Sequence, residues 1–95
     1  MVIFKHIKDI KEYISLQQKA GRVAGFVPTM GALHDGHLAL IKESGQENGI
    51  TVCSIYVNPT QFNNASDLAK YPRTIERDTE MLNSVGCDVL FHPSN

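Results

Sequence analysis

Two histidines stand three residues apart in the glycine-containing segment PTMGALHDGH, which covers residues 28–37. An apolar run precedes this segment, and a helical pattern begins near Asp35. His34 and His37 would then share the leading edge of that helix. Unpaired backbone N–H groups and the helix dipole attract anions there, and imidazole rings add further donors. The spacing therefore predicts a phosphate-binding segment.

Two other interpretations of this histidine pair stay open. A histidine near a helix end can be a simple surface or structural residue, and H-x-x-H spacing can form half of a metal site. No third metal ligand is evident in the sequence, so a metal is the weaker alternative. The glycines favour a ligand, because Gly31 permits a tight turn and Gly36 lets a flat ligand such as a purine approach the backbone.

A second polar segment, YVNPTQFNN, covers residues 56–64. Asn58 and Gln61 supply amides that donate and accept hydrogen bonds without charge. Tyr56 and Phe62 flank them as possible aromatic walls. This combination suits a small polar substrate that carries hydroxyl and carboxylate groups. The alternative is an Asn-Pro turn with a solvent-exposed glutamine.

A third segment, KYPRTIERD, covers residues 70–78 and carries two arginines four residues apart. Arg73 and Arg77 could pair with a phosphate or a carboxylate. Surface pairing at a helix start is the ordinary alternative.

The elements that must position these segments alternate between strand and helix. Val2–Phe4 is expected to be extended, and Ile7, Ile10 and Ile14 recur at helical spacing up to Ala20-Gly21. Val23–Val27 reads as a buried strand closed by Pro28. The remaining expectations are a helix from Asp35 to the QENG segment, a strand over Ile50–Val57, a helix over about residues 74–85 and a strand around residues 88–92.

This alternation predicts an α/β fold with a Rossmann-like parallel sheet and flanking helices. Val27 and Ile50 are far enough apart for a right-handed crossover. Two loops, PTMGALHDGH at residues 28–37 and NPTQF at residues 58–62, leave the carboxyl ends of predicted strands. Ligands bind at that edge of open α/β sheets, so the two segments should form one site.

Composition excludes several classes of protein. The chain has 95 residues, 20% of them charged, and a net charge of −1, so it lacks the basic stripe of a nucleic-acid binder. The N-terminal residues show no uninterrupted apolar stretch for a signal peptide or membrane span. Cys53 and Cys87 are too few for a disulfide scaffold and should be buried, reduced thiols. A cytoplasmic protein is expected.

Three segments together resemble the pantothenate synthetase (pantoate–β-alanine ligase) family. They are FVPTMGALHDGHLALI at residues 26–41, VNPTQF at 57–62 and DLAKYPRT at 67–74. They occur in the family's order and spacing over essentially the whole chain. The His-x-Gly-His element alone is shared with other nucleotidylyltransferases and class I aminoacyl-tRNA synthetases. Tyr56 and Thr60 stand where phenylalanine and methionine are more common in the family.

The resemblance implies an ATP-dependent condensation of pantoate with β-alanine through a pantoyl adenylate, with release of AMP and pyrophosphate. Magnesium would accompany the triphosphate, without a metal site in the protein. His34 and His37 would be catalytic, with His37 as proton donor. Gln61 would bind pantoate near β-alanine, and Asn58 would line the same pocket with Tyr56 and Phe62. The implied ATP-binding residues are Pro28, Thr29, Met30, Gly31, Ala32, Leu33, His34, Asp35, Gly36 and His37.

Family members are longer than this chain and carry a second ATP-contacting region beyond the position that matches residue 95. The resemblance thus implies that residues 1–95 are the N-terminal portion of a nucleotide-binding domain, without the C-terminal domain. Such a portion should fold at least in part, should not make pantothenate alone, and should self-associate as a homodimer or otherwise. The alternatives are another His-x-Gly-His nucleotidylyltransferase and a non-catalytic nucleotide-binding module.

Overall fold

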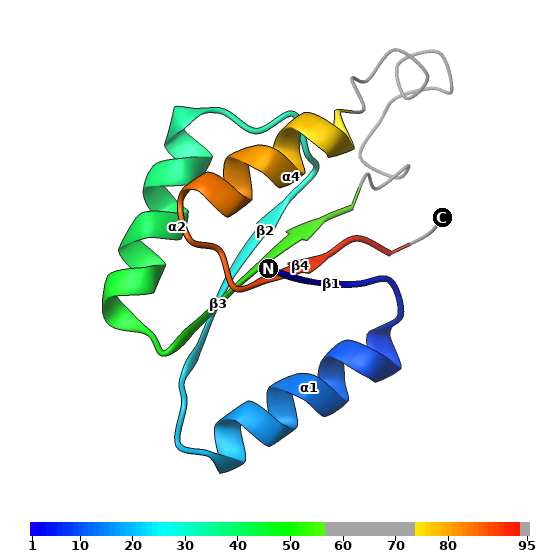
Figure 1. Ribbon diagram of the computed structural model, residues 1–95, viewed down its shortest axis with the longest axis vertical. Coiled ribbons are helices and arrows are strands. Elements are labelled where there is room, and N and C mark those ends of the chain that lie inside the picture. Colours follow the sequence, from blue (N-terminus) through cyan, green and yellow to red (C-terminus); the bar gives the residue numbers. More distant parts are fainter. Residues whose placement is uncertain (57–73, 94–95) are drawn as a thin grey trace.

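The computed structural model describes residues 1–56 and 74–93, which form strands and helices in alternation (Figure 1). All four strands belong to one sheet. The strands are β1 (Val2–Phe4), β2 (Ala24–Thr29), β3 (Ile50–Ile55) and β4 (Val89–Phe91). The helices are α1 (Ile7–Lys19), α2 (Asp35–Glu47) and α4 (Ile75–Ser84).

The sheet is parallel throughout the described residues, in the strand order β1-β4-β3-β2. Each strand is followed by a helix or enters the sheet after one, as the sequence pattern predicts. The predicted α/β class with a parallel sheet and flanking helices is confirmed.

β3 is one of the two inner strands of this sheet, between β4 and β2, and all six of its residues are buried. Its sequence ITVCSI is nearly continuous in apolar and β-branched residues, which is typical of a parallel strand covered on both faces. The predicted strand is therefore confirmed over Ile50–Ile55, but it ends one residue before Tyr56, which was expected to belong to it, and Val57 lies outside the described residues.

β2 corrects the expectation of a buried strand that ends before Pro28. The strand continues through Pro28, which is in register with Ser54, and ends at Thr29. Within residues 1–56 and 74–93, β2 pairs only with β3, so proline can occupy its outer side without removing a ladder hydrogen bond. Phe26 is accordingly 60% exposed.

Helices cover both faces of the sheet (Figure 1). On one face, Ile10 of α1 packs in a cluster with Ile50, Val52 and Val89. On the opposite face, side chains of α2 and α4 close the larger cluster, which contains Val27, Leu33, Ile41, Cys53, Ile55, Leu82, Cys87 and Leu90. The two clusters make the sheet a rigid support for the loops at its carboxyl edge.

α2 lies close against β2 because the strand offers a glycine at the contact. A Cβ atom on Gly25 would collide with the side chains of Ser44 and Asn48. The Ser44 and Thr51 hydroxyls form a buried hydrogen bond of 3.0 Å between α2 and β3. This polar contact and the close approach fix the position of α2, whose N-cap and first turn carry His34 and His37.

Both cysteines are free and buried, which confirms the expected reduced thiols. Burial raises the pKa of Cys53 to about 12, so its thiol stays protonated and unreactive at neutral pH. None of the helices in the two described stretches combines the length and apolar character that crossing a bilayer requires.

Candidate functional site

His34 and His37 form a cap at the start of α2, and their rings lie against each other. The Gly36 N–H donates to His34 Nδ1 at 3.0 Å. The His34 N–H donates to His37 Nδ1 at 3.2 Å. The ring centroids are 4.1 Å apart, with an interplanar angle of 40°. This reciprocal pair is a capping box in which imidazoles take the places usually held by a hydroxyl and a carboxylate.

The cap determines which nitrogen of each ring carries the proton. Each Nδ1 faces a backbone N–H and must act as an acceptor, so it is unprotonated. In the neutral form the proton therefore resides on Nε2 of both rings. The two Nε2–H groups are free of the cap and can donate to a ligand at the helix start.

His37 is biased further toward the neutral form. Burial, reinforced by the adjacent His34 ring, lowers the pKa of His37 below its ordinary value, while the Asp78 carboxylate partly opposes that shift. At neutral pH the His37 ring is thus a hydrogen-bond donor through Nε2, without a positive charge.

Gly36 is required by the cap itself. A Cβ atom on Gly36 would lie 2.8 Å from Cε1 and 3.1 Å from Nδ1 of His34. A side chain at this position would push the His34 ring off the helix start. The predicted close approach of a flat ligand to Gly36 remains a prediction.

The loop before α2 contains two consecutive residues in the left-handed region. Gly31 has φ 86°, and Ala32 has φ 51°. Glycine adopts this conformation freely, whereas for an L-residue such as alanine it costs roughly 1–2 kcal/mol of conformational free energy. Ala32 therefore needs external contacts to hold its backbone there.

Those contacts come from Asp78 on α4. The Ala32 N–H donates to Asp78 Oδ2 at 2.9 Å, and the Leu33 N–H donates to Oδ1 at 2.9 Å. The Thr74 hydroxyl donates to Oδ2 at 3.2 Å, and the Arg77 guanidinium lies 3.7 Å from Oδ1. The Asp78 side chain is only 1% exposed, and all its partners are donors, so it is a buried carboxylate.

Asp78 was not among the predicted site residues, although the sequence carries a signal for it. Asp78 falls in the inward stripe of α4 with Ile75 and Leu82, and Val85 continues that stripe at the C-cap. An acidic residue in an otherwise apolar helical stripe indicates a buried carboxylate with dedicated donors. Arg77, one of the two arginines noted in the sequence, is more than half exposed. Arg73 lies outside the described residues.

Thr29 joins the loop to the centre of the sheet. Its hydroxyl donates to the Ser54 carbonyl at 2.9 Å and accepts from the Gly31 N–H at 3.1 Å. The Tyr56 N–H donates to the Thr29 carbonyl at 3.0 Å. The ends of β2 and β3 therefore lie side by side, so the predicted loops leave the same edge of the sheet.

The other predicted ATP-binding residues are distributed between solvent and core. Pro28 and Asp35 are exposed, and Met30 is half-buried. Leu33 is 1% exposed and anchors the loop in the core, so only its backbone is available to a ligand.

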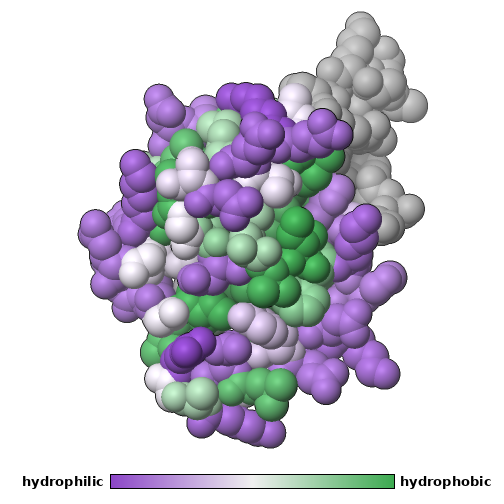
Figure 2. Space-filling view, in the orientation of Figure 1, coloured by the Kyte–Doolittle hydropathy of each residue, from purple (hydrophilic) through white to green (hydrophobic). Residues whose placement is uncertain are grey.

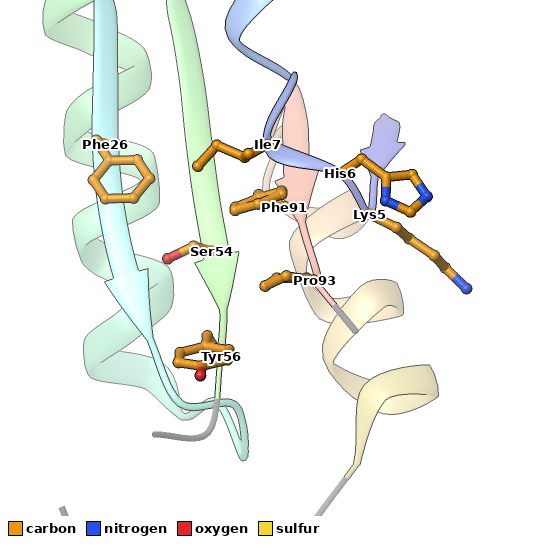
Figure 3. A pocket seen from close by; sticks show the side chains of 8 residues that line it. All are labelled: Lys5, His6, Ile7, Phe26, Ser54, Tyr56, Phe91 and Pro93. Atoms are coloured by element: carbon orange, nitrogen blue, oxygen red, sulfur yellow. The ribbon is translucent and has the colours of Figure 1, made fainter. Parts of the chain in front are cut away.

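Of the predicted substrate-binding residues, only Tyr56 belongs to the described part of the chain. Asn58, Gln61 and Phe62 lie outside it. The Tyr56 side chain lines an open groove of about 450 Å³ between the carboxyl ends of the strands and the start of α1 (Figure 3). Phe26 and Phe91 form its apolar walls, and Ser54 contributes a hydroxyl.

The described residues include no group of three or more histidine, cysteine or acidic side chains that could hold a metal ion. The Asp78 carboxylate is occupied by donors of the loop. In the described residues the H-x-x-H pair therefore has no third ligand, and the capped rings offer N–H donors in place of metal-binding lone pairs. The arrangement can bind an anion such as phosphate.

Comparisons with known proteins identify the family that this chain resembles. The sequence profile of a family described as Pantoate-beta-alanine ligase matches residues 2–95. The chain is 49% identical over 94 residues to a pantothenate synthetase of Bacteroides thetaiotaomicron and 50% identical over 93 residues to one of Allorhizobium ampelinum. The two matches include 99% and 98% of this chain, but only 33% and 32% of the two relatives. The chain thus spans about a third of the length of these curated relatives.

Solved structures give the same result. A pantoate-beta-alanine ligase of Francisella tularensis, complexed with beta-gamma ATP and beta-alanine, superposes with a TM-score of 0.84 at 46% identity. A pantothenate synthetase of Thermus thermophilus superposes with a TM-score of 0.81 at 39% identity. Each match covers 99% of this chain, and 36% and 32% of the solved chains respectively.

Proposed function

This chain belongs to the pantoate-beta-alanine ligase family, and we propose on that premise that its protein condenses pantoate with β-alanine at the expense of ATP. The observation that carries the proposal is the pair of capped imidazoles at the start of α2. Their free Nε2–H groups and the amides of the first helical turn offer several donors to one anion. The triphosphate of ATP is the substrate group that needs them.

The proposed reaction has two steps. A carboxylate oxygen of pantoate attacks the α-phosphorus of ATP, the bond to the β-phosphate oxygen breaks, and pyrophosphate leaves. The amine of β-alanine then attacks the acyl carbon of the adenylate and loses a proton, and AMP departs with the bridging oxygen. The first step places extra charge on the leaving pyrophosphate, so donors that are already positioned there lower its barrier.

His34 and His37 would contact the phosphates through Nε2. His37 is neutral at pH 7, so it would act by holding its Nε2 proton in a hydrogen bond to a phosphate oxygen. Pro28–Thr29 and the loop up to Leu33 would border the nucleotide. Asn58, Gln61 and Phe62 would bind pantoate and β-alanine together with Tyr56.

Magnesium would arrive on the triphosphate. Mg²⁺ is commonly held by substrate phosphates and water in this way, and it would neutralise part of the phosphate charge. A homodimer and a cytoplasmic location, where ATP is available, belong to the same proposal.

The test uses a chimera in which this chain replaces the matching third of the Bacteroides thetaiotaomicron relative. With ATP, β-alanine and pantoate whose carboxylate carries heavy oxygen, the chimera should release pantothenate, pyrophosphate and AMP that contains heavy oxygen. His37→Ala should lower kcat by about 100- to 1000-fold, as expected for the loss of one transition-state donor.

The outcome that contradicts this function is equally definite. A folded chimera that forms no labelled AMP would overturn it. If His37→Ala changed only the KM for pantoate, the phosphate role of His37 would be wrong. The 95-residue chain by itself is expected to bind ATP weakly at best and not to sustain turnover, because it spans about a third of the relatives' length.

A further inference from the structure

Asp78 connects α4 to the loop that precedes the histidine cap. It lies more than forty residues from that loop in sequence, yet it accepts two consecutive loop amides, from Ala32 and Leu33. Neither amide belongs to a helix or strand, so the carboxylate replaces the backbone partners that regular structure would supply.

The two amides point at one carboxylate only because Gly31 and Ala32 turn in the left-handed region. A Cβ atom on Gly31 would lie 3.2 Å from Asp78 Oδ2 and 3.1 Å from Ile55 Cγ2. Loop conformation and carboxylate position are therefore mutually dependent. Ala32, which is strained in this conformation, is held there by the charge-assisted bond to Asp78.

The held loop leads directly into the cap. Leu33 is anchored in the core and bonded to Asp78, and the next residue is the N-cap residue His34. The direction in which Leu33 leaves the loop determines where the His34 N–H and ring lie. Both cap hydrogen bonds depend on those two groups of His34.

We propose that Asp78 is a positioning residue: by fixing Ala32 and Leu33 it orients the His34–His37 cap toward the phosphates of the nucleotide. The inference rests on the proposed function for the identity of the ligand. The orientation of the cap is a property of the chain that can be measured without any ligand.

The test compares Asp78→Asn with Asp88→Asn in the 95-residue chain. Asn keeps the shape of the side chain, but the two loop amides donate to different carboxylate oxygens, and Asn replaces one of them with an NH2 donor that faces an N–H. Asp88 is the matched control, because its carboxylate accepts the Thr51 N–H at 2.7 Å without contacting the loop. Backbone hydrogen exchange is measured by NMR at His34 and Gly36, whose amides do not contact Asp78, relative to amides of α1.

In Asp78→Asn, exchange at His34 and Gly36 should rise about tenfold relative to α1, since a charge-assisted bond is lost. ATP titrated over millimolar concentrations should bind about tenfold more weakly. Adding Ala32→Gly should recover most of both losses, because glycine adopts the left-handed conformation without a partner. Asp88→Asn should change neither quantity.

The proposal would be overturned if Asp78→Asn accelerated exchange uniformly throughout the chain and Ala32→Gly did not reverse the effect. Asp78 would then be a purely structural residue. If Asp78→Asn does not fold, Thr74→Ala removes one donor to the carboxylate and should accelerate the same two amides selectively; unchanged exchange would again overturn it. A wild-type chain that ignores ATP would count against the proposed function, whereas the exchange results would still decide the role of Asp78.

Discussion

At the scale of single residues, the chemistry of this protein depends on which ring nitrogens of His34 and His37 accept hydrogen bonds in the cap and which remain free to donate. Histidines that cap a helix with Nδ1 must present Nε2–H outward, so the backbone selects the tautomer that suits a phosphate. Protonation of either ring would place a second donor opposite a backbone N–H and break the cap. The cap thus couples the charge state of the site to its geometry.

That coupling predicts how stability depends on pH. Because the pKa of His37 is lowered in the folded chain, the unfolded chain binds the proton more readily just below pH 6.5. The free energy of unfolding should therefore be fully retained above pH 6.5 and should fall as the pH drops toward the lowered pKa of His37. Urea denaturation on both sides of pH 6.5 measures this.

The carboxylates of the chain also titrate on acidification, so variants isolate the contribution of His37. His37→Gln should lose part of the pH dependence. His6→Gln is the control, because His6 is exposed and makes no side-chain bond at the start of α1. Equal pH dependence in wild type and His37→Gln would contradict the prediction.

At the scale of elements, the site is a loop and a helix start held by three neighbours. Thr29 ties the loop to β3, Asp78 ties it to α4, and Ser44 fixes α2 on the sheet. Each contact is polar and at least partly buried, which favours one arrangement over others that apolar packing alone would tolerate.

Replacing Gly31, which precedes α2, or Gly45, which lies within it, with alanine should change the free energy of unfolding in opposite directions. Gly31→Ala combines a φ of 86° with close contacts to Ile55 and Asp78, so it should lower the free energy of unfolding by about 2 kcal/mol and weaken ATP binding. Gly45→Ala lies in exposed helix with open space around it and should raise the free energy of unfolding by about 0.5–1 kcal/mol. Urea denaturation of both variants measures the difference.

The two substitutions control for each other, since both add one methyl group to the same chain. A destabilising Gly45→Ala would indicate that α2 is not an unstrained helix at that position. If Gly31→Ala left the free energy of unfolding unchanged, the loop would be able to relax around the added methyl group. That result would contradict the inference that the conformation at Gly31 and the position of the Asp78 carboxylate depend on each other.

At the scale of the whole molecule, apolar residues remain on the surface. Figure 2 shows apolar side chains gathered in the middle of the face seen in Figure 1, among mostly polar ones. The exposed large apolar residues include Val2, Ile3, Ile7, Leu16, Val23, Phe26, Leu40 and Tyr56. Several of them border the groove of Figure 3, and contiguous apolar surface of this kind favours association.

We therefore expect the 95-residue chain to self-associate as its concentration rises. Phe26→Ser should weaken association, because Phe26 is 60% exposed on β2 and lines the groove. Leu16→Ser removes a residue of α1 that is 59% exposed and lies outside that groove, so it should have less effect. Sedimentation velocity over a concentration series measures this, and a monomer at every concentration would contradict it.

The sequence by itself determined the class of fold, the segment that carries the histidines and the family. Periodicity and turn residues are local signals, so a strand that begins at Ile50 and a helix that begins near Asp35 could be predicted from them. The prediction that the first strand ends before Pro28 was wrong, because β2 continues to Thr29. Whether proline ends a strand depends on which neighbours the strand has, and that is a property of the sheet.

Only the tertiary structure decided how the site is held. The contact between Asp78 and Ala32 joins residues far apart in the chain, and no periodic pattern specifies which buried carboxylate meets which loop. The tautomer of each histidine likewise follows from the direction of a backbone N–H, which exists only once the loop is folded. Local propensities can identify the residues that do chemistry, whereas their geometry results from packing between distant segments.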